Sequence, residues 1–152
     1  MTLPDIFSPD TTAELFRRID LLRADTPAQW GKMSASQMIK HCHVPYLQAL
    51  GYDTKKPAFM ARFFLKYIFK KSMVNEVPYK PNLPTAPAFI VKGEPDLVTE
   101  REKLKSLIRE TEQKGATWFE GRKQLAMGEL KAVEWNNLLY KHIDHHLRQF
   151  GV

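Results

Sequence analysis

The C-terminal turns of the chain constrain its fold more than any other stretch, because they carry three of its five histidines. Residues 131–150 read KAVEWNNLLYKHIDHHLRQF. An α-helix advances about 100° per residue, so one inward stripe collects Trp135, Leu138, Leu139, His142, His145, His146 and Gln149. Lys141, Asp144 and Arg148 are expected to face outward. Burying an unpaired polar group costs about 1–3 kcal/mol, so inward histidines require hydrogen-bond partners or a metal.

Length and composition indicate one globular domain over residues 1–152. No apolar run approaches the ~18 residues that a transmembrane helix needs. The N-terminal stretch MTLPDIFSPD lacks the basic and apolar regions of a secretory signal. The single cysteine, Cys42, cannot form an internal disulfide, and we interpret it as a small buried apolar residue in preference to a thiolate. We therefore expect a cytoplasmic protein.

The net charge of +6 is concentrated in one element. Six basic residues lie between Lys55 and Lys71, and Asp53 is the one acidic neighbour. Such a balance is compatible with nucleic acid, an anionic membrane surface or an acidic ligand. The sequence contains no recognisable helix motif for binding nucleic acid, so we expect no nucleic-acid partner. A membrane partner is the less favoured interpretation.

Helical periodicity and cap residues predict an all-α fold. The expected helices lie at about residues 10–24, 35–50, 57–71, 96–114 and 131–150. Asp10 or Thr11 is the expected cap of the first, and Asp96 and Gly115 are the expected start and stop of the one at 96–114. Ser34 and Gln37 form a predicted capping box for the second helix, and Gly51 is its expected C-terminal stop. Residues 72–95 contain five prolines and no helical period, which predicts a long extended crossover. The pattern thus indicates a helical bundle with one extra amphipathic helix, the one at 57–71.

That extra helix has an apolar arc too wide to be left uncovered in an ordinary soluble domain. Our first interpretation is that it packs on the bundle or across a homodimer. The alternative is docking at a membrane surface, or a wall of a substrate tunnel.

His41 lies on the second helix, four residues before Pro45. Because proline cannot donate to the carbonyl four residues earlier, we expect a kink just after His41. His43 should face away from it, at about 160° around the helix.

His142 and His146 are four residues apart and can present imidazole nitrogens to one cation. An HxxxH pair alone is weak evidence of a metal. A third histidine from another helix strengthens it, because three protein ligands are typical of open zinc sites. Nitrogen ligands do not distinguish Zn²⁺ from Ni²⁺ or Fe²⁺.

Two stretches carry a resemblance to a known superfamily. WGKMSASQMIKHCH, with Ser34 seven residues before His41, and HIDHHLRQFG resemble the two signatures of DinB-like (DinB/YfiT-like) four-helix-bundle proteins. PTAPAF and YKHIDHHLRQFG resemble one functionally uncharacterised branch of it, and the likeness runs from Trp30 to the end of the chain.

The resemblance implies a four-helix bundle in which His41, His142 and His146 hold a divalent metal. His145 then becomes a supporting residue, Gln149 is placed to contact a metal-bound water or to orient an imidazole, and Trp135 is a candidate pocket residue. We expect Zn²⁺, with Ni²⁺ or Fe²⁺ as alternatives.

By the same resemblance we expect a metal-dependent enzyme acting on a small-molecule substrate, as a thiol S-transferase using a low-molecular-weight thiol or as a hydrolase. The competing hypothesis is a non-catalytic binding protein that docks on a membrane or a protein partner through residues 57–71.

Overall fold

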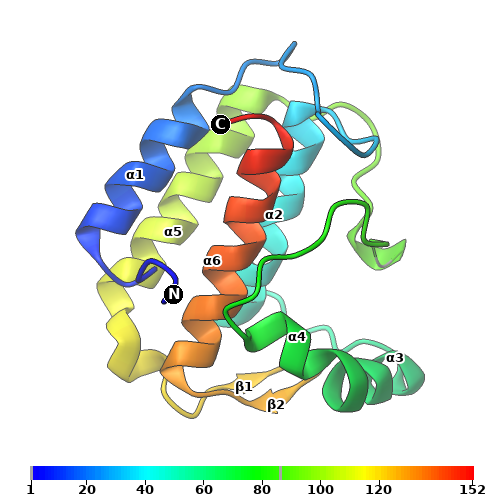
Figure 1. Cartoon of the computed structure of the whole chain (residues 1–152), viewed down its shortest axis with the longest axis vertical. Coiled ribbons are helices and arrows are strands. Elements are labelled where there is room, and N and C mark those ends of the chain that lie inside the picture. Colours follow the sequence, from blue (N-terminus) through cyan, green and yellow to red (C-terminus); the bar gives the residue numbers. More distant parts are fainter. Residues whose placement is uncertain (1, 86) are drawn as a thin grey trace.

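The computed structural model describes residues 2–85 and 87–152 and is mostly helical. Its four longest helices pack lengthwise around one core (Figure 1). These are α1 (Pro9–Asp20), α2 (Ala35–Leu50), α5 (Leu97–Phe119) and α6 (Ala132–Gln149). The predicted all-α class is confirmed, with one small addition that the sequence did not indicate. This is an antiparallel hairpin of β1 (Lys123–Gln124) and β2 (Gly128–Glu129).

The cap residues of α2 confirm the predicted boundaries. The Ser34 side chain accepts from the Gln37 backbone N–H at 3.2 Å, and the Gln37 side chain accepts from the Ser34 N–H at 3.1 Å. Gly51 adopts the left-handed conformation with φ of 87°, which a side chain would disfavour. The helix continues through Pro45.

Three predicted helix boundaries were wrong. α1 begins after Ser8, whose hydroxyl accepts from the Thr11 N–H at 3.2 Å, so Asp10 and Thr11 are not its cap. It also ends at Asp20 rather than near residue 24. Gly115 interrupts α5 with φ of 69°, as its position suggested, but the chain then makes one more helical turn. That turn carries Phe119 into the core, where it is fully buried.

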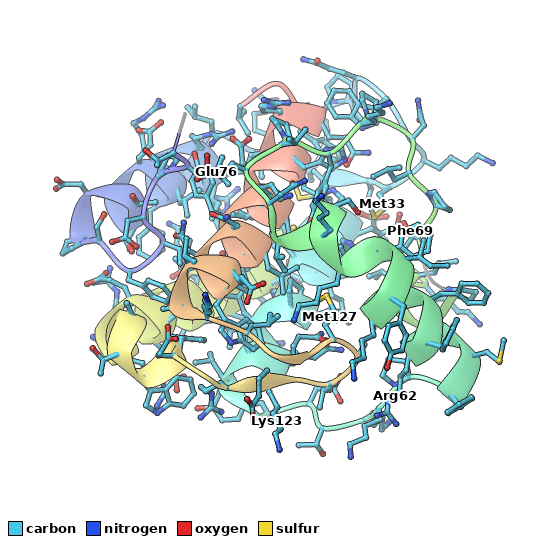
Figure 2. All side chains as sticks on the ribbon, turned by 60° about the horizontal axis from the view of Figure 1, so that its bottom comes forward. Met33, Arg62, Phe69, Glu76, Lys123 and Met127 are labelled. Atoms are coloured by element: carbon cyan, nitrogen blue, oxygen red, sulfur yellow. The ribbon has the colours of Figure 1, made fainter. Side chains whose placement is uncertain are left out.

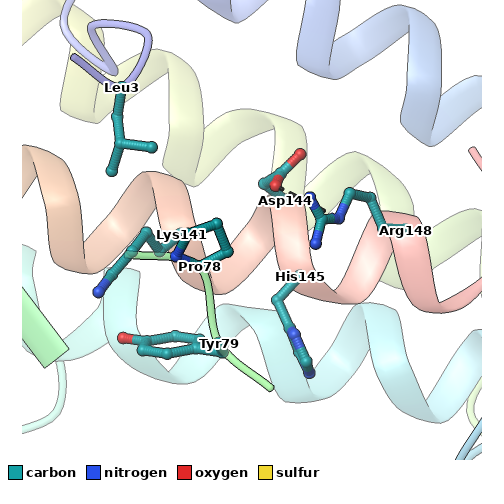
Figure 3. A pocket seen from close by; sticks show the side chains of 7 residues that line it. All are labelled: Leu3, Pro78, Tyr79, Lys141, Asp144, His145 and Arg148. Carbon is teal, nitrogen blue, oxygen red and sulfur yellow. Dashed lines mark ion pairs between the residues drawn. The ribbon is translucent and has the colours of Figure 1, made fainter. Parts of the chain in front are cut away.

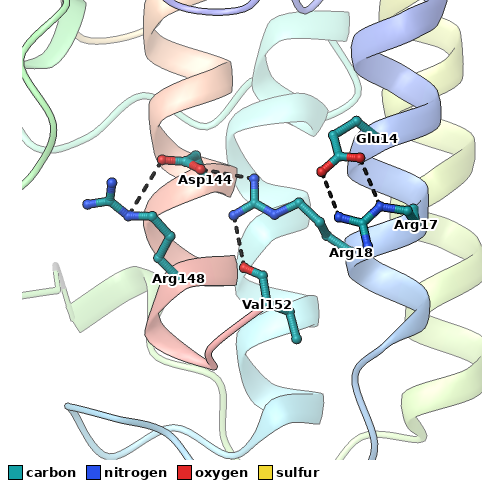
Figure 4. A network of polar contacts seen from close by, with 6 residues as sticks. All are labelled: Glu14, Arg17, Arg18, Asp144, Arg148 and Val152. Atoms are coloured by element: carbon teal, nitrogen blue, oxygen red, sulfur yellow. Dashed lines mark hydrogen bonds and ion pairs between the residues drawn. The ribbon is translucent and has the colours of Figure 1, made fainter.

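An ion-pair network joins the first and last helices (Figure 4). Arg18 on α1 donates to Asp144 on α6 and to the Val152 carbonyl, both at 2.9 Å. Asp144 also lies 3.7 Å from Arg148. Since Arg18 and Asp144 are mostly shielded from water, this pair is screened less than an exposed one. The outward polar face of α6 is therefore partly covered by α1.

The crossover produces the clearest departure from the predicted faces of α6. It runs beside α6 and contains one short 3₁₀ turn, η2 (Pro87–Phe89). Lys141 was expected to face solvent, yet it is only 3% exposed. Its Nζ donates to the Ser72 carbonyl at 2.8 Å, to Asn75 Oδ1 at 2.9 Å and to the Val77 carbonyl at 3.1 Å. Burial lowers the pKa of Lys141 to about 8. The PTAPAF stretch lies in this crossover, and its Ala86 is outside the described residues.

The predicted helix at 57–71 is three consecutive helical segments. They are α3 (Phe59–Phe64), the π-helical η1 (Leu65–Phe69) and α4 (Lys70–Val74). None of the three contains a fully buried residue, and only Leu65, Met73 and Val74 pack partly against the core, so the bundle leaves most of this apolar arc exposed. Packing across a homodimer stays a prediction. Among the described residues, no helix is long and apolar enough to span a membrane.

The three hydrogen bonds of Lys141 predict a measurable role in stability. Lys141→Met leaves three acceptors at the α6–crossover contact without their donor, so the free energy of unfolding should fall by about 2–3 kcal/mol. Urea denaturation measures the change. Lys92→Met is the matched control, because Lys92 is exposed and the same substitution there should stay within ~0.5 kcal/mol. Equal losses in the two variants would contradict the role assigned to Lys141.

Candidate metal site

Three histidines from two helices meet where α2 packs beside α6. His41 comes from α2, and His142 and His146 come from successive turns of α6. One nitrogen from each ring lies within 4.8 Å of the other two. The ring centroids are 4.7–5.0 Å apart. The structure thus brings together the three residues that the sequence proposed as ligands, close enough to share one metal ion.

The hydrogen bond of His41 determines which of its nitrogens can bind a metal. Its Nδ1 lies 3.1 Å from the Phe89 carbonyl, which can only accept. Nδ1 of the neutral ring therefore carries the proton, and Nε2 carries the lone pair. His41 Nε2 in turn lies 3.1 Å from His142 Nε2, so the lone pair points into the cluster.

Gln149 fixes His146 in the same way. Gln149 Nε2 donates to the Trp30 carbonyl at 2.7 Å, which orients the amide and leaves Oε1 facing His146. His146 Nδ1 lies 2.8 Å from that oxygen and must donate to it. The remaining nitrogen, Nε2, then carries the lone pair. The predicted role of Gln149 in orienting an imidazole is consistent with this geometry.

His142 differs from the other two rings in the hydrogen bonding of its outer nitrogen, Nδ1. Its Nδ1 is buried and has no hydrogen-bond partner among the described residues. Without a metal, the 3.1 Å contact requires His142 Nε2 to donate to His41 Nε2, since two facing lone pairs would repel. In a tetrahedral zinc site with Zn–N near 2.05 Å, ligand nitrogens sit about 3.3 Å apart. The spacing of the two Nε2 atoms is close to that value, so the donor set fits a divalent ion.

Burial keeps the three rings in the neutral form that binds metals. It lowers the pKa of His41 and, together with the neighbouring His146 and His41, lowers that of His142 far below the usual value. It lowers the pKa of His146 to about 3. Protonation therefore competes with metal binding only weakly at neutral pH. The cluster contains no carboxylate, so an ion held there keeps its full positive charge.

His145 lies next to the cluster but does not belong to it. Its ring packs between Trp30 at 5.7 Å and Tyr79 at 5.9 Å, and lies 5.2 Å from His146. It lines a cavity of only about 10 Å³ beside Tyr79 and Lys141 (Figure 3). That space holds no more than one water. His145 thus supports the face of His146, in agreement with its predicted secondary role.

Trp135 was expected near the site, and the structure places it elsewhere. It sits seven residues before His142, about 10 Å along the helix axis. Its ring packs on Phe119 at 5.8 Å, and its Nε1 donates to the Arg122 carbonyl at 3.3 Å. Trp135 anchors the hairpin end of α6, because its inward face there meets core side chains and not the cluster.

The other residues near His41 on α2 point away from the cluster. His43 Nε2 lies 2.8 Å from the Glu100 carbonyl on α5, as its predicted orientation requires. Cys42 is fully buried beside Met38, and burial raises the pKa of its thiol. This environment matches the interpretation of Cys42 as an apolar core residue.

Sequence reasoning missed the two backbone carbonyls that orient the site. Phe89 and Trp30 contribute main-chain oxygens, which every residue has, so no residue type signals them. The one sequence feature that could have indicated Trp30 is its position four residues before Ser34, where the capping box begins.

A family model described as "Protein of unknown function (DUF1569)" matches residues 8–151. Searches of curated proteins and of solved structures found no match.

The lowered histidine pKa values predict that acid destabilises the metal-free protein. An unfolded histidine takes up a proton near pH 6.5, whereas folded His146 does so only near pH 3. The contribution of His146 to the free energy of unfolding is therefore at its maximum above pH 6.5 and is lost as the pH falls from 6.5 towards 3. The pKa values of the other four histidines are also lowered, so their effects have the same sign.

Urea unfolding in the presence of a chelator should show a loss of more than about 1.4 kcal/mol between pH 6.5 and 5.5. This interval lies above the range in which most Asp and Glu side chains titrate. A free energy of unfolding that is flat across it would contradict neutral burial of the cluster.

Proposed function

This chain belongs to the DUF1569 family, and we propose that it is a metal-dependent enzyme whose His41, His142 and His146 hold one divalent cation. The observation that carries the proposal is the convergence of three ring nitrogens within 4.8 Å. Two of the rings are fixed from behind by the Phe89 carbonyl and the Gln149 amide, so that their lone pairs face the cluster. Outer hydrogen bonds of this kind are typical of histidines that ligate metals.

We further propose that the fold is a DinB-like four-helix bundle. The resemblance of the two histidine stretches motivates this assignment, and the packing of α1, α2, α5 and α6 around one core supports it. In that arrangement one ligand comes from the second long helix and two come from the last. The long crossover and the extra helix at 59–74 are compatible additions.

Zn²⁺ is the metal we favour, with Ni²⁺ and Fe²⁺ as alternatives. Three imidazoles and open positions are typical of catalytic zinc, and nitrogen ligands bind the other two ions as well. The absence of a carboxylate in the cluster weighs against Mg²⁺ and Ca²⁺, which prefer oxygen ligands.

We propose thiol S-transfer, with hydrolysis as the alternative, and a low-molecular-weight thiol as the substrate class. A divalent cation supplies Lewis acidity, which favours the deprotonated form of a water or thiol. The neutral ligands add no negative charge, so the site attracts anions such as a thiolate. Phe89 and Gln149 hold the protons of His41 and His146 on the outer nitrogens, away from the reaction.

Metal analysis of three variants tests the site. Protein purified without a nickel column should contain about one equivalent of metal. His142→Ala removes a ligand and should abolish stoichiometric binding. Gln149→Leu removes the acceptor for His146 Nδ1 and should weaken metal affinity by about 10- to 100-fold.

His145→Ala is the matched control, because His145 lies on the same helix and touches His146 without belonging to the cluster. It should retain the metal. Absence of metal from the parent protein, or equal loss in the His142 and His145 variants, would overturn the site.

Cobalt substitution tests thiol binding separately from metal binding. Co²⁺ replaces Zn²⁺ in nitrogen sites and absorbs visible light, which zinc does not. Adding a low-molecular-weight thiol should produce a new sulfur-to-cobalt charge-transfer band that an equal concentration of the matching alcohol does not produce. A Co²⁺ spectrum unaffected by thiols would exclude thiol transfer and favour the hydrolase alternative.

A further inference from the structure

The helical stretch formed by α3 and η1 exposes a concentrated apolar surface. Apart from Leu65, which packs partly against the core, its large apolar side chains are 43–78% exposed, a range set by Phe64 and Phe59. Seven of them contribute: Phe59, Met60, Phe63, Phe64, Tyr67, Ile68 and Phe69. The stretch lies at the edge of the molecule, away from α1 and α5 (Figure 1). Figure 2 shows its side chains, with Arg62 and Phe69 labelled, on that edge. So many adjacent exposed apolar residues indicate an interaction surface.

Residues 54–75, which include this stretch together with the loop before α3 and helix α4, carry the whole net charge of the protein. Residues 54–75 contain six Lys and Arg and no Asp or Glu. The full chain has 23 basic and 17 acidic residues, so the remainder has 17 of each and is balanced. The cations are Lys55, Lys56, Arg62, Lys66, Lys70 and Lys71. A surface of one sign next to exposed aromatic rings selects for an anionic partner.

The aromatic rings and the cations are arranged side by side. Phe63 packs on Tyr67 with ring centroids 5.0 Å apart, and Lys66 Nζ lies 5.2 Å from the centre of the Tyr67 ring. Phe59, Arg62, Phe63, Lys66 and Tyr67 line an open groove of about 320 Å³, which Ala126 from the hairpin loop completes. Apolar walls with cations at the rim suit a partner that is itself amphipathic and anionic.

The surface is held in place by the rest of the fold. Lys70 Nζ donates to the Glu129 carbonyl on β2 at 3.1 Å. Immediately after it, the Ser72 carbonyl accepts from the buried Lys141 of α6. The stretch is therefore tied at its C-terminal end to both the hairpin and α6, and it presents a defined face.

We propose that α3 and η1 dock on the surface of an anionic lipid bilayer. The aromatic and aliphatic side chains enter the headgroup–acyl boundary, and the cations contact the lipid phosphates. This surface is independent of the histidine cluster. It does not cross the bilayer, in agreement with the absence of a spanning helix among the described residues.

Two other occupants fit the surface less well. A second copy of the chain would bring Arg62 and Lys66 against their counterparts, because these cations line the same groove as Phe59, Phe63 and Tyr67. Single-stranded nucleic acid would use the rings for base stacking, but Met60 and Ile68 offer no ring and are more than half exposed. A bilayer accommodates all seven apolar side chains at once.

Vesicle co-sedimentation tests the proposal with the full chain. The protein should sediment with vesicles of equal parts phosphatidylglycerol and phosphatidylcholine, and not with phosphatidylcholine alone. High salt should release it. The double variant Arg62→Glu with Lys66→Glu should bind at least ~30-fold more weakly. The control, Lys32→Glu with Lys92→Glu, makes the same charge change at exposed positions elsewhere and should bind more tightly than the first variant.

A second pair of variants tests the apolar contribution. Phe59→Ser with Met60→Ser should reduce binding at least tenfold, whereas Val98→Ser with Val133→Ser removes apolar groups of similar exposure on α5 and α6 and should not. All four positions are exposed, so the variants should fold, which circular dichroism checks.

Three results would overturn the proposal: no sedimentation of the parent protein with anionic vesicles, equal loss of binding in the test and control variants, or binding that a single-stranded oligonucleotide abolishes. A dimer in sedimentation equilibrium that the Phe59 and Met60 variant dissociates would assign the face to a second copy instead.

Discussion

Desolvation of three imidazoles between α2 and α6 is the constraint on which the rest of the structure depends. A buried ring nitrogen without a partner costs about 1–3 kcal/mol, and neither helix offers its own backbone for the purpose. The partner of His41 is the Phe89 carbonyl from the crossover, and the partner of His146 is the Gln149 side chain of α6, which the Trp30 carbonyl from the loop before α2 holds in place. Two irregular segments are therefore positioned so that they satisfy the hydrogen bonds of buried imidazoles. The unsatisfied Nδ1 of His142 shows that this need is met only in part by the described residues.

The elements that the sequence predicted well are those governed by local chemistry. The capping box at Ser34, the Gly51 stop and the Asp96 cap depend on side chains within a few residues of one another. The inward positions of His142 and His146 follow from helical spacing alone, and their meeting with His41 required only that α2 and α6 be neighbours. Local rules of this kind transfer directly from sequence to structure.

The failures at Lys141 and Trp135 share one physical cause, which is contact between segments far apart in the chain. Lys141 lies on the polar side of α6 by every local criterion, and it becomes buried because the crossover brings three acceptors to it. Trp135 shares the inward stripe with the histidines, but the stripe is longer than the site, and its first turns meet Phe119 instead. A helical stripe predicts which side of the helix faces inward, and it does not predict which residues that side contacts.

The exposed stretch at α3 and η1 shows a different limit of prediction from sequence. Its apolar side chains predict that it is buried, whereas its cations predict that it stays exposed. A wide apolar arc normally predicts coverage by the chain's own core, because exposed apolar surface costs about 25 cal/mol per Å². Covering this arc would also have pressed its cations, Arg62 and Lys66, against the bundle. Desolvating unpaired cations costs more free energy than burying the apolar surface would gain. Residues 54–75 contain no Asp or Glu that could pair with these cations. Seven of the apolar side chains of α3 and η1 therefore stay outside the core, and the composition of the stretch favours an environment that supplies negative charge and an apolar phase together.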